Sequence, residues 1–122
     1  MDYELSVEDK KWNKMWDLWC NEEAKSPYAE IMDYCSEVNN GGHAQYFSNL
    51  GDLGELEENI KVLFTSLPEV FIERLKKAYE LYLEDEFGEE TEIVMEECDD
   101  IFYDNEELID GILKEYSATL EV

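Results

Sequence analysis

The chain carries 33 Asp and Glu residues against nine Lys and Arg residues, a formal net charge of −24 over 122 residues. Folding must gather these carboxylates around one small core against their mutual repulsion. Such a charge is typical of disordered chains, but 44% of the residues are hydrophobic and the aromatic content is 13%. A chain of this length can bury about two thirds of its surface. We therefore expect a single packed domain over residues 1–122.

The three cysteines, Cys20, Cys35 and Cys98, are odd in number and lack a C-x-x-C spacing. The first residues contain no apolar run of signal-peptide type, and no stretch approaches the roughly 20 apolar residues of a membrane span. These features predict reduced thiols in a cytoplasmic protein. The negative charge also makes naked nucleic acid and anionic membranes poor partners.

Apolar residues recur at helical spacing along nearly the whole chain, and strand alternation is not evident. This pattern predicts an all-α fold, a compact single domain of five or six helices. Ser6 is the expected N-cap of the first helix, with Asp9 in its first turn. An apolar stripe follows it, made of Trp12, Met15, Trp16, Trp19 and Cys20.

Ser26 and Pro27 are expected to open a second helix, with Ser26 as the cap. Its stripe is Tyr28, Ile31, Cys35 and Val38, and Gly41 is expected to end it. A short helix over residues 43–49 should then lead through Gly51 and Gly54 into a fourth helix. The apolar face predicted for that helix is Leu53, Leu56, Ile60, Leu63, Phe64 and Leu67.

Residues 66–69, with Pro68, mark the next boundary. The helix behind it should bury Phe71, Leu75, Ala78 and Tyr82 and end at Asp85 or Glu86. A last helix opened by Asn105 carries Leu108, Ile109, Ile112, Leu113 and Tyr116. The pattern over residues 87–104 does not decide between structures, and residues 91–95 could be a helical turn or a short extended piece.

The stretch VNNGGHAQYFSN, residues 38–49, has the composition of an active-site loop. The favoured interpretation is structural: a glycine takes the left-handed conformation, and Tyr46 and Phe47 enter the core. Gln45 and Asn49 would then satisfy backbone groups at a helix junction. The alternatives are a Cys-His catalytic site using His43 and a metal site made of His43 and Cys35.

These residues also carry a resemblance. NGGHAQYFSN resembles the pattern Asn-Gly-Gly, any two residues, Gln-Tyr-Phe, any residue, Asn, of a helical domain family best known from a dimeric bacterial DNA mimic protein. SLPEVFIERLKKA at residues 66–78 and CDDIFYDNEELIDGILKEY at residues 98–116 are similar to later segments of the same family. The resemblance covers about residues 30–116. It implies a helical fold and a protein that occupies the DNA-binding surface of a helix-turn-helix transcription factor, and a possible homodimer.

The chain contains no Lys or Arg between Lys77 and Lys114, whereas acidic residues crowd this interval. A surface of carboxylates can present negative charge to the basic residues that otherwise bind phosphates. The predicted partner-binding residues are Glu84, Asp85, Glu86, Glu89, Glu90, Glu92, Glu96, Glu97, Asp99, Asp100, Asp104, Glu106 and Glu107.

Plain solvation is the main alternative for this acidic run, because acidic faces keep proteins soluble and helix N-termini favour acids such as Glu69, Glu106 and Glu107. Calcium is a further alternative, but residues 104–111 lack the ligand spacing of an EF-hand loop. We expect neither a cofactor nor a metal. Lys10, Lys11 and Lys14 on the first helix are interpreted as a solvated face.

Taken together, the sequence predicts a non-enzymatic acidic binding protein whose partner is a basic DNA-binding protein, bound through electrostatic capture. An immunity or inhibitor protein against a basic toxin or nuclease would use the same charge and is the first alternative. A small hydrolase using His43 is the second.

Overall fold

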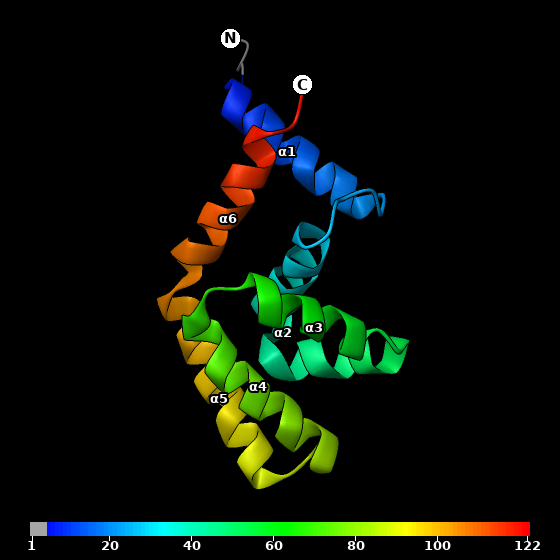
Figure 1. Ribbon diagram of the computed structural model, residues 1–122, viewed down its shortest axis with the longest axis vertical. Helices are drawn as coiled ribbons and strands as arrows, with labels where there is room; N and C mark the ends of the chain where they lie inside the picture. Colours follow the sequence, from blue (N-terminus) through cyan, green and yellow to red (C-terminus); the bar gives the residue numbers. More distant parts are fainter. Residues whose placement is uncertain (1–4) are drawn as a thin grey trace.

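The computed structural model describes residues 5–122, which form six α-helices and no strand. The helices are α1 (Val7–Cys20), α2 (Tyr28–Leu53), α3 (Leu56–Ser66), α4 (Glu69–Glu84), α5 (Glu89–Asp104) and α6 (Glu106–Ala118). This confirms the expected all-α domain of five or six helices. Along the longest axis, α1 and the C-terminus lie at one end, and the hairpin of α4 and α5 forms the other (Figure 1).

The long helix α2 is the centre of the core and contacts α3, α5 and α6. Ile31, Val38 and Phe47 of α2 are fully buried. Phe102 of α5 and Ile109 of α6 meet them with no exposed surface. Helical spacing marks Ile31, Val38 and Ile109 as apolar, because a surface helix buries the stripe that faces its neighbours.

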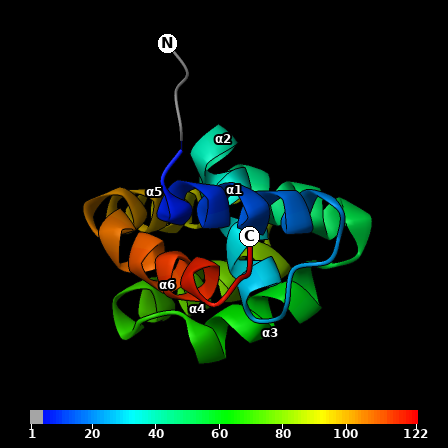
Figure 2. The ribbon, with the colours of Figure 1, turned by 90° about the horizontal axis from the view of Figure 1, so that it is seen from above.

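Helix α1 packs chiefly on α6, and both are seen together from the end of the molecule in Figure 2. Ser6 caps α1 as expected, because its Oγ accepts a hydrogen bond from the backbone N of Asp9. Met15 is fully buried, and the three tryptophans are partly buried against the core. The rings of Trp12 and Trp16, and of Trp16 and Trp19, meet edge to face.

The lysines of α1 lie on an exposed face, as the sequence suggested: Lys10 and Lys14 are exposed and Lys11 is partly buried. Two of them also make hydrogen bonds. Lys11 Nζ donates to the carbonyl of Ala118, 3.1 Å away, and Lys14 Nζ donates to the carbonyl of Glu121. The C-terminal end of a helix carries partial negative charge, which attracts cations. Lys11 therefore ties α1 to the last residue of α6, and Lys14 ties it to the segment that follows.

The glycine pair interrupts α2, as the sequence predicted. Gly41 and Gly42 have non-helical dihedral angles, with φ of 76° at Gly42, so that two helical segments meet at a bend within Tyr28–Leu53. The second segment corresponds to the predicted short helix but extends to Leu53, and Gly54 is its left-handed C-cap with φ of 73°. Leu53 was wrongly assigned to the apolar face of the next helix, because it is the last residue of α2 and is 68% exposed.

The sequence predicted Ser26 as the N-cap of α2, but the side chain of Ser26 does not cap this helix. Pro27 occupies the N-cap position of α2, and Ser26 Oγ donates to the Glu30 carboxylate. Asn105 stands at the N-cap position of α6 as predicted, but its amide bonds Ile101 O. The backbone at Ser26 and Asn105 thus follows the expected boundaries, while their side chains bond elsewhere.

The segment that the sequence left undecided is the helix α5. Its buried side is Thr91, Val94, Met95, Cys98 and Phe102, and it packs on α4 and α2. β-Branched residues such as Thr91, Ile93 and Val94 have a lower helix propensity, which is why the local pattern was ambiguous. Burial of one face against two helices decides the conformation.

Gly42 gives a direct test of the bend. A side chain there would combine a left-handed backbone with a Cβ atom 3.0 Å from the Asp99 carboxylate. We expect Gly42→Ala to lower the free energy of unfolding by at least about 1–2 kcal/mol, the cost of that conformation for an L-residue. Urea unfolding of both proteins measures the difference.

Gly111→Ala is the matched control, because a Cβ atom at Gly111 meets nothing within 4 Å in the exposed face of α6. This change should stabilise the protein by up to about 1 kcal/mol, since alanine is the better helix former. A Gly42→Ala protein as stable as the native one would contradict the role given to the bend.

Candidate partner-binding surface

The predicted acidic residues follow one another over the end of α4, the turn behind it, all of α5 and the start of α6. We call this set the acidic surface. Ten of its thirteen members are exposed, namely Glu84, Asp85, Glu86, Glu89, Glu90, Glu92, Glu96, Asp100, Asp104 and Glu107. The remaining three, Glu97, Asp99 and Glu106, are partly buried.

Helix α5 concentrates this charge. Its 16 residues include eight carboxylates and no cation. At 1.5 Å per residue the helix is about 24 Å long, so that one carboxylate occurs about every 3 Å. One strand of duplex DNA carries a phosphate about every 3.4 Å along the axis. The linear charge density of α5 is therefore comparable to that of one DNA strand.

The positions of these acids are only partly explained by helix stability. Glu89, Glu90 and Glu92 lie in the first turn of α5, where the helix dipole stabilises anions. Asp104 is its last residue, and no basic residue stands in the last turn. A carboxylate at that end faces the negative pole of the dipole and is unfavourable. Local helix energetics thus accounts for the start of α5 but not for its end.

Two members of the acidic surface on α5 bond to other helices, and Glu86 accepts a hydrogen bond from the hydroxyl of Tyr82 at 3.4 Å. Glu97 forms an ion pair with Arg74 of α4, at 3.3 Å. Asp99 faces the bend of α2, where its Oδ1 accepts from the backbone N of His43 at 2.8 Å and from His43 Nδ1 at 2.6 Å. Sequence spacing had assigned both to the free surface, because it does not show which side of α5 meets a neighbour.

His43 is the middle of a buried polar chain. Its Nδ1 donates to Asp99, and its Nε2 accepts from the hydroxyl of Tyr34. His43 has no exposed surface and Tyr34 is 1% exposed. Burial first, and then nearby Cys98, raises the pKa of Tyr34 well above its ordinary value, so that Tyr34 stays a donor. These hydrogen bonds satisfy buried polar groups at the bend, and of the three side chains only Asp99, which is 31% exposed, reaches solvent.

The neighbouring residues of the motif behave in part as the sequence predicted. Tyr46 and Phe47 are fully buried. Gln45 and Asn49 do not bond freed backbone groups; both amides donate to Oε2 of Glu37, at 2.9 and 2.8 Å. Glu37, which lies before the glycine pair, thus connects the two halves of α2 across the bend.

The two buried thiols are poor nucleophiles. Burial, followed by the charges of Asp110 and Glu106, raises the pKa of Cys35 to about 12. Burial, followed by the charges of Asp99 and Glu97, raises the pKa of Cys98 to about 12. Reactivity requires the thiolate. Cys35 is therefore a protonated core residue at neutral pH.

Sequence reasoning missed a second acidic group, between α2 and α3. Glu30, Asp33, Glu55 and Glu58 line a hollow of about 350 Å³ together with Asn59 and two apolar residues. Burial raises the pKa of Asp33, as do Glu30 and Glu55, although the hydrogen bonds from Trp19 and Asn59 oppose the shift. Oε2 of Glu30 is buried and finds no hydrogen-bond partner within residues 5–122. Glu55 lies 25 residues from Glu30, so that no local spacing signals the group.

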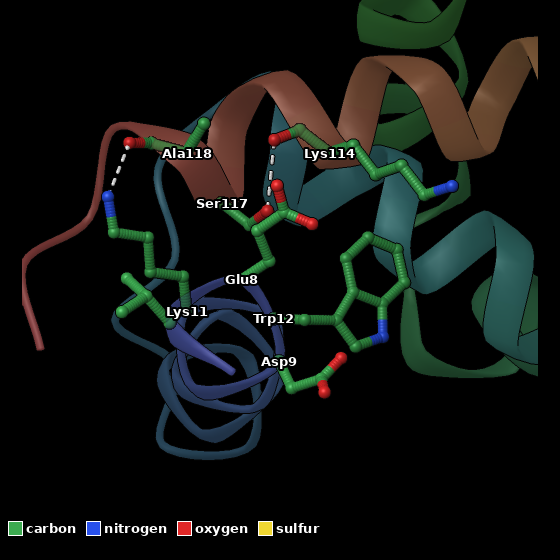
Figure 3. A pocket seen from close by; sticks show the side chains of 8 residues that line it. Glu8, Asp9, Lys11, Trp12, Lys114, Ser117 and Ala118 are labelled. Atoms are coloured by element: carbon green, nitrogen blue, oxygen red, sulfur yellow. Dashed lines mark hydrogen bonds between the residues drawn. The ribbon is translucent and has the colours of Figure 1, made fainter. Parts of the chain in front are cut away.

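A larger hollow of about 630 Å³ lies between α1 and α6. Figure 3 shows the indole of Trp12 at its side, with the Lys11 and Ala118 hydrogen bond and the Ser117 to Lys114 hydrogen bond at its border. The lining residues are Val7, Glu8, Asp9, Lys11, Trp12, Lys114, Ser117 and Ala118. Charges of both signs line it, and none of its polar groups forms a nucleophile and base pair.

Over residues 5–122, no group of three or more His, Cys, Asp or Glu side chains is arranged to hold a metal ion. None of the helices within these residues combines the length and apolar character needed to cross a membrane.

Comparison of the chain with protein-family models, with curated proteins and with solved structures gives no match. The family resemblance of residues 30–116 therefore stays a prediction.

Asp99→Asn tests the contact at the bend. Burial alone would raise the pKa of the Asp99 carboxyl, but the side-chain and backbone hydrogen bonds from His43 outweigh it and lower the pKa. Because the folded-state pKa of Asp99 is lowered, its carboxylate stabilises the fold at pH values above the unfolded-state pKa of about 3.9. This contribution is lost as the pH falls through the folded-state pKa. We expect the variant to be less stable by about 1–2 kcal/mol at pH 7.

Urea unfolding between pH 7 and pH 3 measures this effect. The difference between the native protein and Asp99→Asn should begin to shrink below about pH 4, where the carboxyl of the unfolded state takes up a proton, and should vanish below the lowered folded-state pKa. Asp52→Asn, an exposed change on α2, should leave the stability nearly unchanged. A gap that stays constant down to pH 3 would show that the charge of Asp99 does not contribute.

Asp100→Asn combined with Asp104→Asn tests the unfavourable end of α5. Each change removes like-charge repulsion, and Asp104→Asn also removes an anion from the negative helix end. We expect the double variant to gain about 1 kcal/mol at low salt and to melt a few degrees higher. Moderate salt should raise the melting temperature of the native protein and narrow the difference, because the Debye length falls to about 8 Å at physiological ionic strength.

Glu107→Gln is the control, because Glu107 lies in the first turn of α6, where the helix dipole stabilises an anion instead of destabilising it. It should raise the melting temperature by less than half of the gain of the double Asp variant, since it removes a favourable dipole interaction together with the repulsion. Melting temperatures that do not respond to salt would mean that the carboxylates are too dispersed to act together.

Proposed function

We propose that the chain is a non-enzymatic binding protein that mimics DNA and occupies the basic surface of a DNA-binding protein, such as a helix-turn-helix transcription factor. The acidic surface is the binding site. Its carboxylates pair with Lys and Arg side chains that otherwise contact phosphates. Binding to a transcription factor would regulate transcription by competition with DNA.

The observation that carries this proposal is the charge of α5. Eight carboxylates, six of them exposed, lie along one helix at an average spacing close to that of phosphates in a DNA strand. They extend to the helix end at which an anion is unfavourable. Binding to a basic partner compensates both the repulsion and the dipole term.

Two other functions use the same chain differently. An immunity or inhibitor protein against a basic toxin or nuclease would bind through the same acidic surface, and the identity of the captured protein separates it from a DNA mimic. A hydrolase using His43 is less well supported, because His43 is fully buried and bonded on both ring nitrogens.

A binding experiment tests the proposal. The tagged protein is used to capture partners from host lysate at low and moderate salt, and each captured protein is then purified. Duplex DNA should compete with the chain for the purified partner, and the affinity should fall steeply with salt. A partner that binds DNA and the chain simultaneously would contradict the DNA-mimic function.

A charge variant locates the site. The changes Glu89→Gln, Glu90→Gln, Glu92→Gln, Glu96→Gln, Asp100→Asn and Asp104→Asn neutralise exposed carboxylates that make no hydrogen bond or ion pair within residues 5–122. We expect this variant to keep its helical spectrum, to bind the partner at least tenfold more weakly and to show a flatter salt dependence.

The matched control neutralises six exposed acids elsewhere, with the changes Asp17→Asn, Glu23→Gln, Asp52→Asn, Glu58→Gln, Glu115→Gln and Glu121→Gln. Both variants have the same net charge. A local site requires a much larger loss from the α5 set. Equal losses from the two sets would show that general acidity, and not the acidic surface, drives binding.

A further inference from the structure

The turn between α4 and α5 presents an unusual apolar side chain. Phe87 lies in this turn and is 83% exposed, and Leu83, one helical turn earlier, is 65% exposed. The turn forms the end of the molecule opposite to α1 and the C-terminus (Figure 1). No neighbouring helix covers it there. Phe87 is thus a large apolar group held in water at an unobstructed end of the fold.

The turn that carries Phe87 is held in place by hydrogen bonds. The buried Thr91 donates its Oγ1 hydrogen to the carbonyl of Asp85 at 2.7 Å and lies 3.3 Å from that of Leu81. The backbone N of Gly88 also donates to Asp85 O, at 3.1 Å. The outward position of Phe87 therefore belongs to an ordered turn. An ordered anchor loses little conformational freedom when it binds.

The surroundings of Phe87 restrict what could cover it. Glu84, Asp85, Glu86, Glu89 and Glu90 flank it in the chain, all exposed. A second copy of the chain would bring another strongly negative turn against this one, and an anionic membrane would repel it. An apolar anchor with a charged rim is the usual composition of an interface centre. A partner surface complementary to Phe87 and its acidic neighbours would therefore be an apolar hollow bordered by Lys and Arg side chains.

We propose that Phe87 is the apolar anchor with which the acidic surface docks on its partner, entering an apolar hollow that Lys and Arg side chains border. The inference rests on the proposed function and adds a specific contact to it. Carboxylates attract any basic surface, whereas Phe87 selects those with an apolar site of suitable position. A guanidinium group over the ring adds a further attraction.

Two synthetic helical peptides of equal charge test the anchor. Both peptides carry arginines along the two borders of one helix face. In the first peptide, leucines around a central alanine lie between the arginines and form an apolar hollow. In the second peptide, serines replace these leucines. The native protein should bind the leucine peptide about tenfold more tightly, measured by calorimetry. Phe87→Ala should lose this preference and keep its affinity for the serine peptide within twofold.

Leu53→Ala is the control, because Leu53 is 68% exposed but lies at the end of α2, outside the acidic surface. It should bind both peptides as the native protein does. Unchanged discrimination in Phe87→Ala would overturn the inference. Sedimentation of the native protein and Phe87→Ala should show no self-association that depends on Phe87, since such association would make a second copy the occupant and also overturn it.

The six-carboxylate α5 variant separates this inference from the proposed function. If the native protein binds both peptides equally and the α5 variant binds neither, electrostatic capture stands and the anchor is wrong. If the native protein binds neither peptide, both the capture mechanism and the anchor fail. If the preference depends on Phe87 and the overall affinity depends on the α5 acids, both hold.

Discussion

The contact between Asp99 and His43 connects the two parts of the molecule that the sequence makes most unusual. The glycine pair bends α2, and the bend directs the backbone N–H of His43 to Asp99. Asp99 Oδ1 accepts hydrogen bonds from this N–H and from Nδ1 of His43. Buried donors of this kind need partners. One carboxylate from the most acidic helix therefore completes the bend of the central helix and fixes how α5 lies on α2.

This contact also explains how so acidic a helix can belong to the core. The buried side of α5 supplies Phe102 and Met95 to the hydrophobic cluster, and Glu97 pairs with Arg74. The other carboxylates face solvent, where charge repulsion is screened. The ten exposed carboxylates of the acidic surface thus repel one another on the face to which the proposed partner would bind. The cost in stability and the proposed binding site share their residues.

Local patterns predicted most of the fold because its core is built from residues at helical spacing. The cap at Ser6 and the boundary at Pro68 followed from residue chemistry alone. The break at Gly41 and Gly42 also followed from glycine chemistry, whereas the structure of α5 did not, since it depends on contacts between distant segments. The acidic surface was visible as a run of charge, but only the structure shows that Asp99 faces inward, that Gln45 bonds Glu37, and that Glu55 joins Glu30 and Asp33 in a hollow.

The three tryptophans of the chain all belong to α1, whose main neighbour is α6. Trp19 makes the indole hydrogen bond to Asp33 that also links α1 to α2. Intrinsic tryptophan emission is therefore a local probe, which reports whether this one helix is docked, whereas far-ultraviolet ellipticity reports all helices together. Any difference between the two signals during unfolding would measure how tightly the docking of α1 is coupled to the rest of the domain.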